Sequence, residues 1–567
     1  MQFSARPIRF ARPRRRSQRP TPVSKPRLLW WRKHRMVTVA VLAALVAGLV
    51  AGVRAGASSL FPPPLNCGAG MVMAGSPPSC IGVNLSFGQF SAHDPAELRA
   101  LESQIHSIDS KAGPYYLSVV LLLDLSPVSG IDTVDYQDQY PGIEGAITAA
   151  WQADNTNAYG TSPKMKLYLG NMGSQYRSWQ GAVHQIVANR AVQHITSVVG
   201  LGQSTIQTRS AAALLGSTAH LPVIGSTVTG DSMNVSPFTH QRNVYFFRVS
   251  TPNSSEARGI AEYVSEDIHP KPADAVVVED TPGDAYESTL AAVAPQALRQ
   301  AGLTVYQPLE YRSGGQPPGE SREAYLGNVF SQMQDNLCQL DPSLVFFAGR
   351  GEDLHAFVQA WADERGCQKA GAPPLRIVSG DDASAVVGDA VVRGAIQQGK
   401  VSLTYITLAD PGMWNSTCTG AKANYDQFVA AFTGKGAACG AGARPGSPRF
   451  SAADLASGQA APTHDAVLAA LKAARDAQGN TPIQDQLVAV ANPESQLNPL
   501  IDLHCTTMLG GANGYISFGP TGNPVDHPLP IVQLNGDGSV IFKDLTWPDG
   551  GPVVNLPARG AGCGPNG

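Results

Sequence analysis

The stretch VVGLGQSTIQTRSAAALLGSTAHLPVIGSTVTGDSM, residues 198–233, indicates the fold of most of this chain. The β-branched residues at 195–199 predict a strand, the small residues at 211–215 predict a helix, and residues 221–224 predict a second strand. Two strands joined through a helix are parallel, and parallel sheets bind ligands at the carboxyl ends of their strands. The hydroxyl-rich turns after both strands are therefore expected at one sheet edge, where their hydroxyls and free N–H groups suit a small anion such as a carboxylate.

This series of elements resembles the core of the type I periplasmic binding proteins, the family of branched-chain amino acid and amide receptors. In that family one strand ends in a Gly/Ser-rich turn and a later Pro-Val-Ile strand runs into a Ser/Thr turn, as residues 202–205 and 222–229 do here. The segment VYFFRVSTPNSSEARGIAEYV, residues 244–264, is similar to the family's crossover into its second lobe. The resemblance spans about residues 117–542, and two late segments share it: the helix THDAVLAALKAAR at 463–475, with His464 in the family's aromatic position, and a closing hairpin of 513–523 and 529–542.

The chain on both sides of this stretch alternates between strand and helix patterns. This alternation predicts an α/β fold with two doubly wound parallel-sheet lobes joined by a hinge. We expect residues 113–250 to form lobe 1 together with 403–495, and residues 251–402 to form lobe 2 together with 496–567. The apolar strand VSLTYITLA at 401–409 is expected to return the chain to lobe 1.

The first 112 residues carry signals for membrane attachment. Residues 1–35 hold twelve Lys/Arg and no acid, and residues 36–53, MVTVAVLAALVAGLVAGV, are uncharged and just long enough to span a bilayer as a helix. The positive-inside rule then predicts a basic cytoplasmic tail, a single-pass transmembrane anchor and an extracellular bulk, in which residues 54–112 form a stalk and a cysteine-bounded cap. The alternative is a signal peptide cleaved at Ala55-Gly56-Ala57. Because the basic tail precedes a membrane segment, we do not expect nucleic acid as a partner.

The cysteines support export. All eight follow the predicted anchor and their number is even, which outside the cell favours disulfides over metal ligands or a catalytic thiol. Spacing leaves the connectivity open, although loop closure favours near neighbours. The favoured pairs are Cys67 with Cys80, Cys338 with Cys367, Cys418 with Cys439, and Cys505 with Cys563.

The resemblance implies a ligand site between the lobes. On lobe 1, Ser204 and Thr205 lie where the family holds a ligand carboxylate, and Val228 and Thr229 match the turn whose backbone carbonyl and hydroxyl hold the ligand ammonium. Each position has a purely structural alternative. Ser and Thr are common helix N-caps, and the turn at Thr229 needs no ligand to explain it.

On lobe 2, Tyr286 falls where the family stacks a tyrosine on the ligand, and Asp381 or Asp382 fits the acidic partner of the ammonium. The alternatives are a half-buried aromatic residue at a helix start and an acidic helix cap. Where the family often has an aromatic residue after the strand SLVFFAG, this chain has Arg350-Gly351. That difference leaves the ligand's identity open.

Motifs for catalysis are absent from the sequence: it has no GxSxG, no HExxH and no Walker loop, and we expect neither a metal nor a cofactor. The predicted function is an extracellular receptor that captures a small amino-acid-like solute between two lobes, rather than an enzyme. It would act either in import through an ABC permease or in sensing through a membrane signalling partner. The alternatives are an exported hydrolase on a doubly wound scaffold and an interaction module that binds no ligand.

Overall fold

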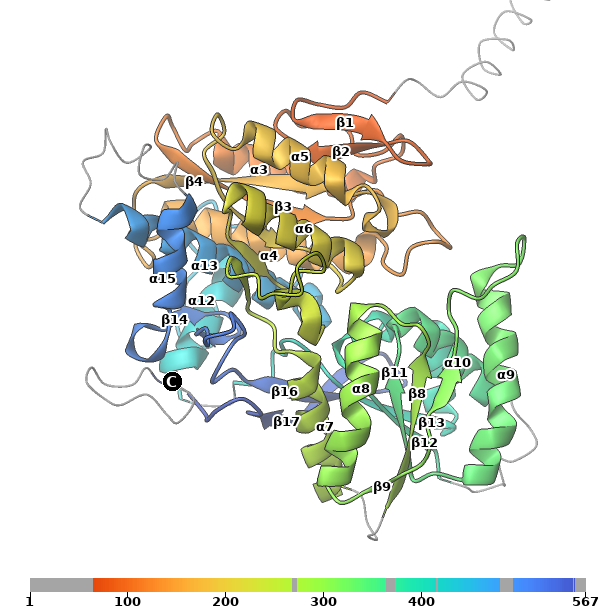
Figure 1. Ribbon diagram of the computed structural model, residues 1–567. Coiled ribbons are helices and arrows are strands. Elements are labelled where there is room, and N and C mark those ends of the chain that lie inside the picture. The colour runs from red at the N-terminus through yellow and green to blue at the C-terminus, as the bar shows by residue number, and fades with distance from the viewer. Residues whose placement is uncertain are drawn as a thin grey trace, which may run out of the picture. The chain divides into compact units, whose positions relative to one another are not determined.

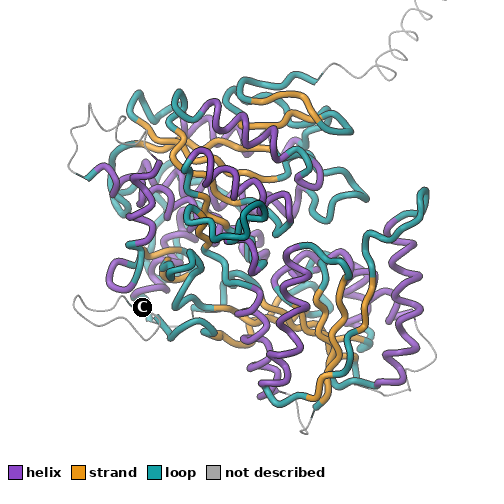
Figure 2. Tube along the Cα trace, in the orientation of Figure 1, coloured by secondary structure: helices purple, strands orange, loops and turns teal. Residues whose placement is uncertain are grey.

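The computed structural model describes residues 65–267, 273–363, 373–414, 417–479, 493–553 and 555. Two mainly parallel sheets organise these residues, each with helices on both faces, as the sequence predicts (Figures 1 and 2). No helix among these residues is long and apolar enough to cross a membrane. The predicted anchor at 36–53 lies outside them.

The sheet of lobe 1 has seven strands. Its five parallel strands are almost entirely buried, as expected for strands covered by helices on both faces. In sheet order the strands are β1 (Met71–Ala74), β2 (Ser79–Val83), β4 (Lys164–Asn171), β3 (Tyr116–Leu123), β5 (Ile195–Gly200), β6 (Val223–Gly225) and β7 (Phe246–Arg248). The antiparallel pair β1 and β2 therefore belongs to this sheet, whereas the sequence analysis placed it in a separate cap.

Helices cover both faces of this sheet. One face packs against α3 (Ala96–Asp109), α4 (Tyr136–Asn155), α12 (Gly420–Thr433), α13 (Ala460–Gln478) and α15 (Leu497–Ile501). The other face packs against α5 (Trp179–Asn189) and α6 (Ile206–Ala219). The small hairpin of β14 (Leu509–Gly511) and β15 (Gly514–Ile516) completes the lobe.

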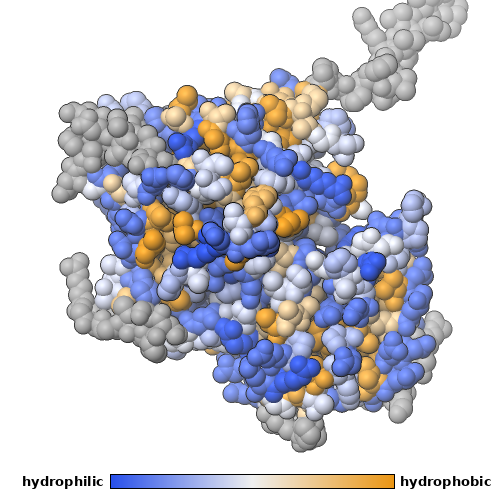
Figure 3. Space-filling model, in the orientation of Figure 1, coloured by the Kyte–Doolittle hydropathy of each residue, from blue (hydrophilic) through white to orange (hydrophobic). Residues whose placement is uncertain are grey.

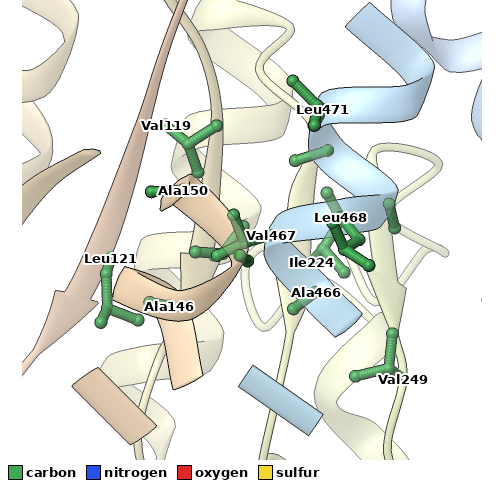
Figure 4. Close-up of a cluster of buried hydrophobic side chains, with 14 of the residues drawn as sticks. Val119, Leu121, Ala146, Ala150, Ile224, Val249, Ala466, Val467, Leu468 and Leu471 are labelled. Carbon is green, nitrogen blue, oxygen red and sulfur yellow. The ribbon is translucent and has the colours of Figure 1, made fainter. Parts of the chain in front are cut away.

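The core between the lobe 1 sheet and its first helical layer is shown in Figure 4. Val119 of β3 and Ile224 of β6 contribute to a buried hydrophobic cluster with Ala146 of α4 and Val467 of α13. Small residues on α4 and α13 let the two helices approach closely. This contact matters for the site, because the first turns of both helices line its cavity.

The sheet of lobe 2 has five parallel strands, an antiparallel pair and one short strand at the side. In order they are β10 (Leu309–Tyr311), β8 (Asp274–Asp280), β11 (Leu344–Ala348), β12 (Leu375–Ser379), β13 (Val401–Ile406), β16 (Leu529–Leu534) and β17 (Val540–Thr546), with β9 (Thr304–Val305) beside β8. One face packs against α7 (Asn253–Asp267) and α8 (Ala285–Gln300), and the other against α9 (Arg322–Leu340), α10 (Gly351–Asp363) and α11 (Ala390–Gln397).

Short 3₁₀ helices fill several turns: η1 (Ser174–Tyr176), η2 (Asp231–Asn234), η3 (Asp381–Val386), η4 (Ala452–Ser457), η5 (Pro493–Gln496) and η6 (Cys505–Thr507). Four buried hydrophobic clusters, two per lobe, hold most of the large apolar side chains. On the face seen in Figure 3, hydrophobic residues accordingly lie scattered among hydrophilic ones over both lobes.

Two predictions about the late part of the chain were wrong. β13 pairs with β12 and β16 and so stays in lobe 2, where its apolar side chains complete that core. The closing hairpin forms from β16 and β17 around the NGDG turn, while the earlier segment at 514–516 pairs with β14 in lobe 1. Both errors have one cause: an apolar strand pattern does not say which sheet edge the strand will meet.

The chain crosses between the lobes three times. The crossovers follow β7, β13 and β15, and they pass through residues 249–252, 407–419 and 517–528. Arg248 ties two of them together: it is fully buried, its Nε donates to Asn523 Oδ1 at 2.9 Å, and its backbone N–H donates to the Gly522 carbonyl. These crossovers form the predicted hinge.

Two predicted disulfides are confirmed, Cys67–Cys80 and Cys418–Cys439. Cys338 and Cys505 are also disulfide-bonded. Their predicted partners, Cys367 and Cys563, lie outside the described residues. No cysteine of the described residues is a free thiol.

Candidate ligand-binding site

A cavity of about 70 Å³ lies between the lobes, at the carboxyl ends of the parallel strands. A single water needs roughly 10–15 Å³, so the cavity has room for a small solute. Lobe 1 contributes Leu121, Leu123, Val134, Asp138, Gln139, Gly142, Tyr176, Gly202, Gln203, Ser204, Ser226, Thr227, Thr229, Leu408, Ser457, Gln459 and Thr463, and lobe 2 contributes Tyr286, Arg350, Asp381, Asp382 and Ser384. Five of the seven residues predicted to bind ligand are in this lining: Ser204, Thr229, Tyr286, Asp381 and Asp382.

Of the two residues predicted to hold a carboxylate, Ser204 lines the cavity and Thr205 does not. Thr205 is the N-cap of α6: its hydroxyl accepts from the Thr208 N–H in a capping box. The structural alternative therefore accounts for Thr205. Ser204 Oγ accepts from the Gly230 N–H at 3.0 Å, which joins the two hydroxyl-rich turns. Its hydroxyl proton stays available as a donor.

The second turn differs from its predicted role in one respect. The Val228 carbonyl does not line the cavity, because it accepts from Arg248 Nη1 at 3.0 Å. A ligand ammonium at this carbonyl would have to displace that bond. Thr229 does line the cavity, and its hydroxyl donates to Asp381 Oδ1 of lobe 2 at 3.2 Å. Predicted groups of both lobes thus meet directly in this structure.

Tyr286 lies at the start of α8 in lobe 2 and lines the cavity. It is 1 % exposed, which is far more buried than the half-buried helix-start aromatic residue of the alternative. Its backbone N–H donates to the Ser204 carbonyl at 3.2 Å, and the Arg350 guanidinium lies over its ring at 4.6 Å. Arginine over an aromatic face is a favourable cation–π contact. The ring is therefore already covered on one face by a residue of this chain.

Arg350 is the only basic side chain in the cavity lining of the described residues, and carboxylates hold it on two sides. Its Nη2 and Nε donate to Asp284 Oδ2 at 2.5 and 3.1 Å, and its Nη1 donates to Asp382 Oδ1 at 3.1 Å. Asp382 Oδ2 also accepts from the Gly351 N–H at the start of α10. Asp382 thus caps a helix and pairs with Arg350, so its charge is committed within lobe 2.

Asp381 differs from its neighbour because no basic group pairs with it among the described residues. Burial, reinforced by Asp382, raises the pKa of the Asp381 carboxyl to about 7, against the lowering effect of Arg350. The fully buried Glu256 accepts from the Asp381 N–H at 3.2 Å, and burial together with Asp381 raises the pKa of Glu256 well above its usual range. Of the two predicted acids, Asp381 is therefore the one available to a ligand cation.

The sequence analysis did not predict several polar residues of the lobe 1 lining, among them Asp138, Gln139 and Gln203. Asp138 and Gln139 lie in the first turn of α4. Their sequence signal was that of a helix start, since Asp135 and Asp138 form a capping box. Gln203 lies within the Gly202–Thr205 turn that the resemblance did single out. Only the tertiary structure distinguishes these cavity-lining residues from ordinary capping and turn residues.

In the described part of the chain, two groups of side chains have the spacing of a metal site. The first, Cys418, Asp426 and Cys439, contains a disulfide, so its sulfurs cannot bind metal as thiolates. The second, Asp280, Glu287 and Asp353, already has protein partners, because Arg322 Nη1 lies 2.5 Å from Asp353 Oδ1. This arginine compensates the charge of Asp353.

No protein-family model matches the chain, and no curated protein matches its sequence. Solved structures do match its fold. The leucine-binding protein LivK from Thermotoga maritima is 16% identical, covers 76% of this chain and 99% of its own, and has a TM-score of 0.53. A solute-binding protein from R. palustris in complex with 4-hydroxybenzoate is 14% identical, covers 76% of this chain and 98% of its own, and has a TM-score of 0.53. The branched-chain amino acid transporter substrate-binding protein LivJ from Streptococcus pneumoniae, in complex with isoleucine, is 17% identical. It covers 76% of this chain and 99% of its own, with a TM-score of 0.50.

These similarities confirm the predicted resemblance at the level of the fold: the described chain has the fold of type I periplasmic binding proteins. The S. pneumoniae and R. palustris structures are substrate- or solute-binding proteins of transporters, and the T. maritima structure is a leucine-binding protein. At these identities the comparison shows the fold, and the ligand has to be argued from the cavity.

Proposed function

We propose that this chain is a solute receptor that binds a small amino-acid-like ligand between its two lobes. The observation that carries the proposal is the cavity at the strand ends, which is lined by hydrogen-bonding groups from both lobes. Such a site is complete only when the lobes are together, so ligand binding favours the closed arrangement by its contacts to both sides.

The cavity favours binding over hydrolysis. Its lining contains several serines, but no histidine or cysteine lines it in the described part of the chain. A serine nucleophile needs an adjacent base, and Ser204 Oγ instead accepts from a backbone N–H. An exported hydrolase therefore has less support than a receptor.

The receptor we propose is held at the membrane by residues 36–53, with residues 1–35 in the cytoplasm and the lobes outside the cell. The charge distribution around the apolar segment supports this orientation, and the disulfides support an oxidising compartment. Ligand capture would serve import through an ABC permease or sensing through a membrane partner. Protease added to intact cells should remove the lobes and leave a short basic fragment in the membrane; a soluble mature protein beginning near Ser58 would contradict the anchor.

Calorimetry of the purified extracellular part against amino acids, amides and short carboxylates tests the binding function. Removing a hydrogen bond to a charged ligand group costs about 1.5–3 kcal/mol, or roughly 10- to 150-fold in affinity. We expect losses of this size for Ser204→Ala and Asp381→Asn without a comparable loss of thermal stability. Unchanged affinity in both variants would show that the ligand lies elsewhere, and an absence of binding across the whole panel would leave only the fold.

A further inference from the structure

The cavity has an excess of acid that no basic group of the described residues balances. Its only basic side chain among the described residues, Arg350, is paired with Asp284 and Asp382. Two further carboxylates line the cavity, Asp138 from lobe 1 and Asp381 from lobe 2, and neither has a basic partner in the described structure. The cavity wall therefore offers two separate places for a positive charge.

We propose that the cavity selects a basic amino acid, with its α-ammonium at Asp381 and its side-chain cation at Asp138 and Gln139. This inference rests on the proposed function and specifies the ligand class within it. An acid for the α-ammonium is expected from the fold. The second cation position, in the first turn of α4, is particular to this chain's own residues.

The α4 position combines a carboxylate with an unpaired acceptor. Asp138 uses Oδ2 to accept from the Asp135 N–H at 2.8 Å, and no bond within the described residues uses its other oxygen. The neighbouring Gln139 is 7 % exposed, and its Oε1 is buried without a hydrogen-bond donor. A buried acceptor left unpaired is costly. An ammonium or guanidinium group, which has several N–H donors and no acceptor, satisfies both residues at once.

The charges facing each other across the cleft point to the same ligand. Asp138 of lobe 1 and Asp382 of lobe 2 line the same cavity, and burial, together with the charges of Asp135, Asp382 and Glu352, raises the pKa of the Asp138 carboxyl to about 7. Closing the lobes brings these like charges together at an energetic cost. A cation held at Asp138 removes that repulsion, so it would stabilise the closed arrangement in a way that an apolar side chain cannot.

The carboxylate of the ligand also has an unpaired partner. Gln203 Nε2 is a buried donor without an acceptor, and Gln203 precedes Ser204, whose hydroxyl proton is available. These two donors lie in the first hydroxyl-rich turn, where an anion was predicted from sequence. The two donors can bind one carboxylate, and the two acids can bind one cation each. A basic amino acid has all three of these groups, whereas a simple diamine lacks the carboxylate.

Matched ligand pairs test this directly in calorimetry on the extracellular part. Lysine and norleucine share the same four-carbon side chain and differ only in the distal ammonium that lysine adds, and arginine and citrulline differ in the charge of the guanidinium group. We expect the cationic member of each pair to bind at least about 10-fold tighter, because a hydrogen bond to a charged group contributes about that factor to the affinity. Cadaverine, which lacks the carboxylate, should bind more weakly than lysine.

Variants separate the two cation positions. Asp138→Asn keeps an acceptor for the helix cap and should remove most of the preference for lysine over norleucine, whereas Asp381→Asn should weaken both ligands alike. Asp335→Asn, an exposed acid on α9, is the matched control and should change neither affinity. Gln139→Leu removes the buried acceptor and leaves every charge in place, so it should reduce the preference for lysine over norleucine in part. It replaces Asp138→Asn as the test if that variant does not fold.

Four results would overturn parts of this proposal. If norleucine binds the parent protein as tightly as lysine, or if Asp138→Asn weakens both equally, the second cation position is wrong, while the receptor function stands. If cadaverine matches lysine, the assignment of the carboxylate to Gln203 and Ser204 is wrong. If no amino acid, amide or carboxylate binds at all, the proposed function fails and this inference fails with it.

Discussion

At the scale of single residues, Arg350 shows how one position changes a binding site. It stands where the resembling family often has an aromatic residue, yet it does not simply add a positive charge to the cavity. Asp284 and Asp382 hold its guanidinium, which packs on the face of Tyr286. Arg350 therefore organises the lobe 2 wall and leaves the cavity's free charge negative.

Arg350→Met should destabilise the protein by about 3–5 kcal/mol, because removing one member of a buried ion pair leaves its partners unpaired. Arg350 is 4 % exposed, so solvent cannot replace it. Urea denaturation of the variant measures the loss. The double variant Arg350→Met with Asp284→Asn should recover part of it, and a single variant as stable as the parent would show that these contacts contribute little.

The acids of the cavity predict an unusual pH dependence. Burial and the neighbouring Asp382 raise the pKa of Asp381 to about 7, although Arg350 acts to lower it. Burial and Asp381 likewise raise the pKa of the adjacent Glu256. A carboxyl with a raised pKa binds more protons when folded, so its contribution to stability is lost as pH rises from about 4 to about 7. His527 acts in the opposite direction, because burial lowers its pKa to about 4 and its contribution is lost as pH falls below about 6.5.

A comparison with Asp381→Asn isolates the acid from these other groups. Between pH 5 and pH 8 the ligand-free parent should lose more thermal stability than the variant, because the variant has no carboxyl to ionise at this position. Scanning calorimetry at both pH values gives the two differences. Parallel pH profiles for parent and variant would mean that Asp381 titrates normally in the folded protein.

At the scale of elements, the contact of α4 with α13 sets one wall of the cavity. A Cβ added to Gly145 of α4 would lie 2.0 Å from the Ala460 carbonyl oxygen of α13, so only glycine permits this approach. Gly142, one turn earlier, lines the cavity beside Thr463 of α13. The spacing of the two helices thus positions Asp138 and Gln139 as well.

Gly145→Ala should destabilise the protein by about 1–3 kcal/mol, since the helices must separate. Helix propensity alone predicts the opposite sign, a gain of up to about 1 kcal/mol. Gly327→Ala on α9 is the matched control, because nothing lies within 4 Å of its added Cβ, and it should show that gain. If both variants are stabilised in chemical denaturation, the close approach of α4 and α13 is not a constraint in solution.

At the scale of the whole molecule, the two lobes communicate through the hinge crossovers and through contacts at the cavity itself. Tyr286 N–H with the Ser204 carbonyl and Thr229 with Asp381 join the lobes directly. Arg248 holds the hinge from inside: its Nη1 donates to the carbonyls of Val228 and Gly230. One buried side chain thus connects the hinge to the second hydroxyl-rich turn.

Arg248→Met should uncouple these parts. The variant removes the charged donor from the Val228 and Gly230 carbonyls, which keep only their bonds from Ser250 Oγ and the Met233 N–H. A hydrogen bond to a charged group contributes about 1.5–3 kcal/mol. We expect lower stability together with a smaller ligand-induced compaction, measured as the change in radius of gyration by small-angle X-ray scattering. Arg258→Met, at a half-exposed arginine on α7, is the control. Normal compaction in the Arg248 variant would show that the hinge works without it.

The sequence by itself determined the alternation of strands and helices, the two-lobed α/β class and two near-neighbour cysteine pairs, Cys67–Cys80 and Cys418–Cys439, because periodicity, caps and short loops are local properties of a chain. It also located Ser204, Thr229, Tyr286 and Asp381 at strand ends and helix starts. Only the tertiary structure decided that β13 joins the sheet of lobe 2 and that Arg248 donates a hydrogen bond to the Val228 carbonyl. It also decided that Asp138 and Gln139 line the cavity. Each of these depends on contacts between segments far apart in the chain, and no local pattern of residues specifies which distant partner a strand, carbonyl or carboxylate will meet.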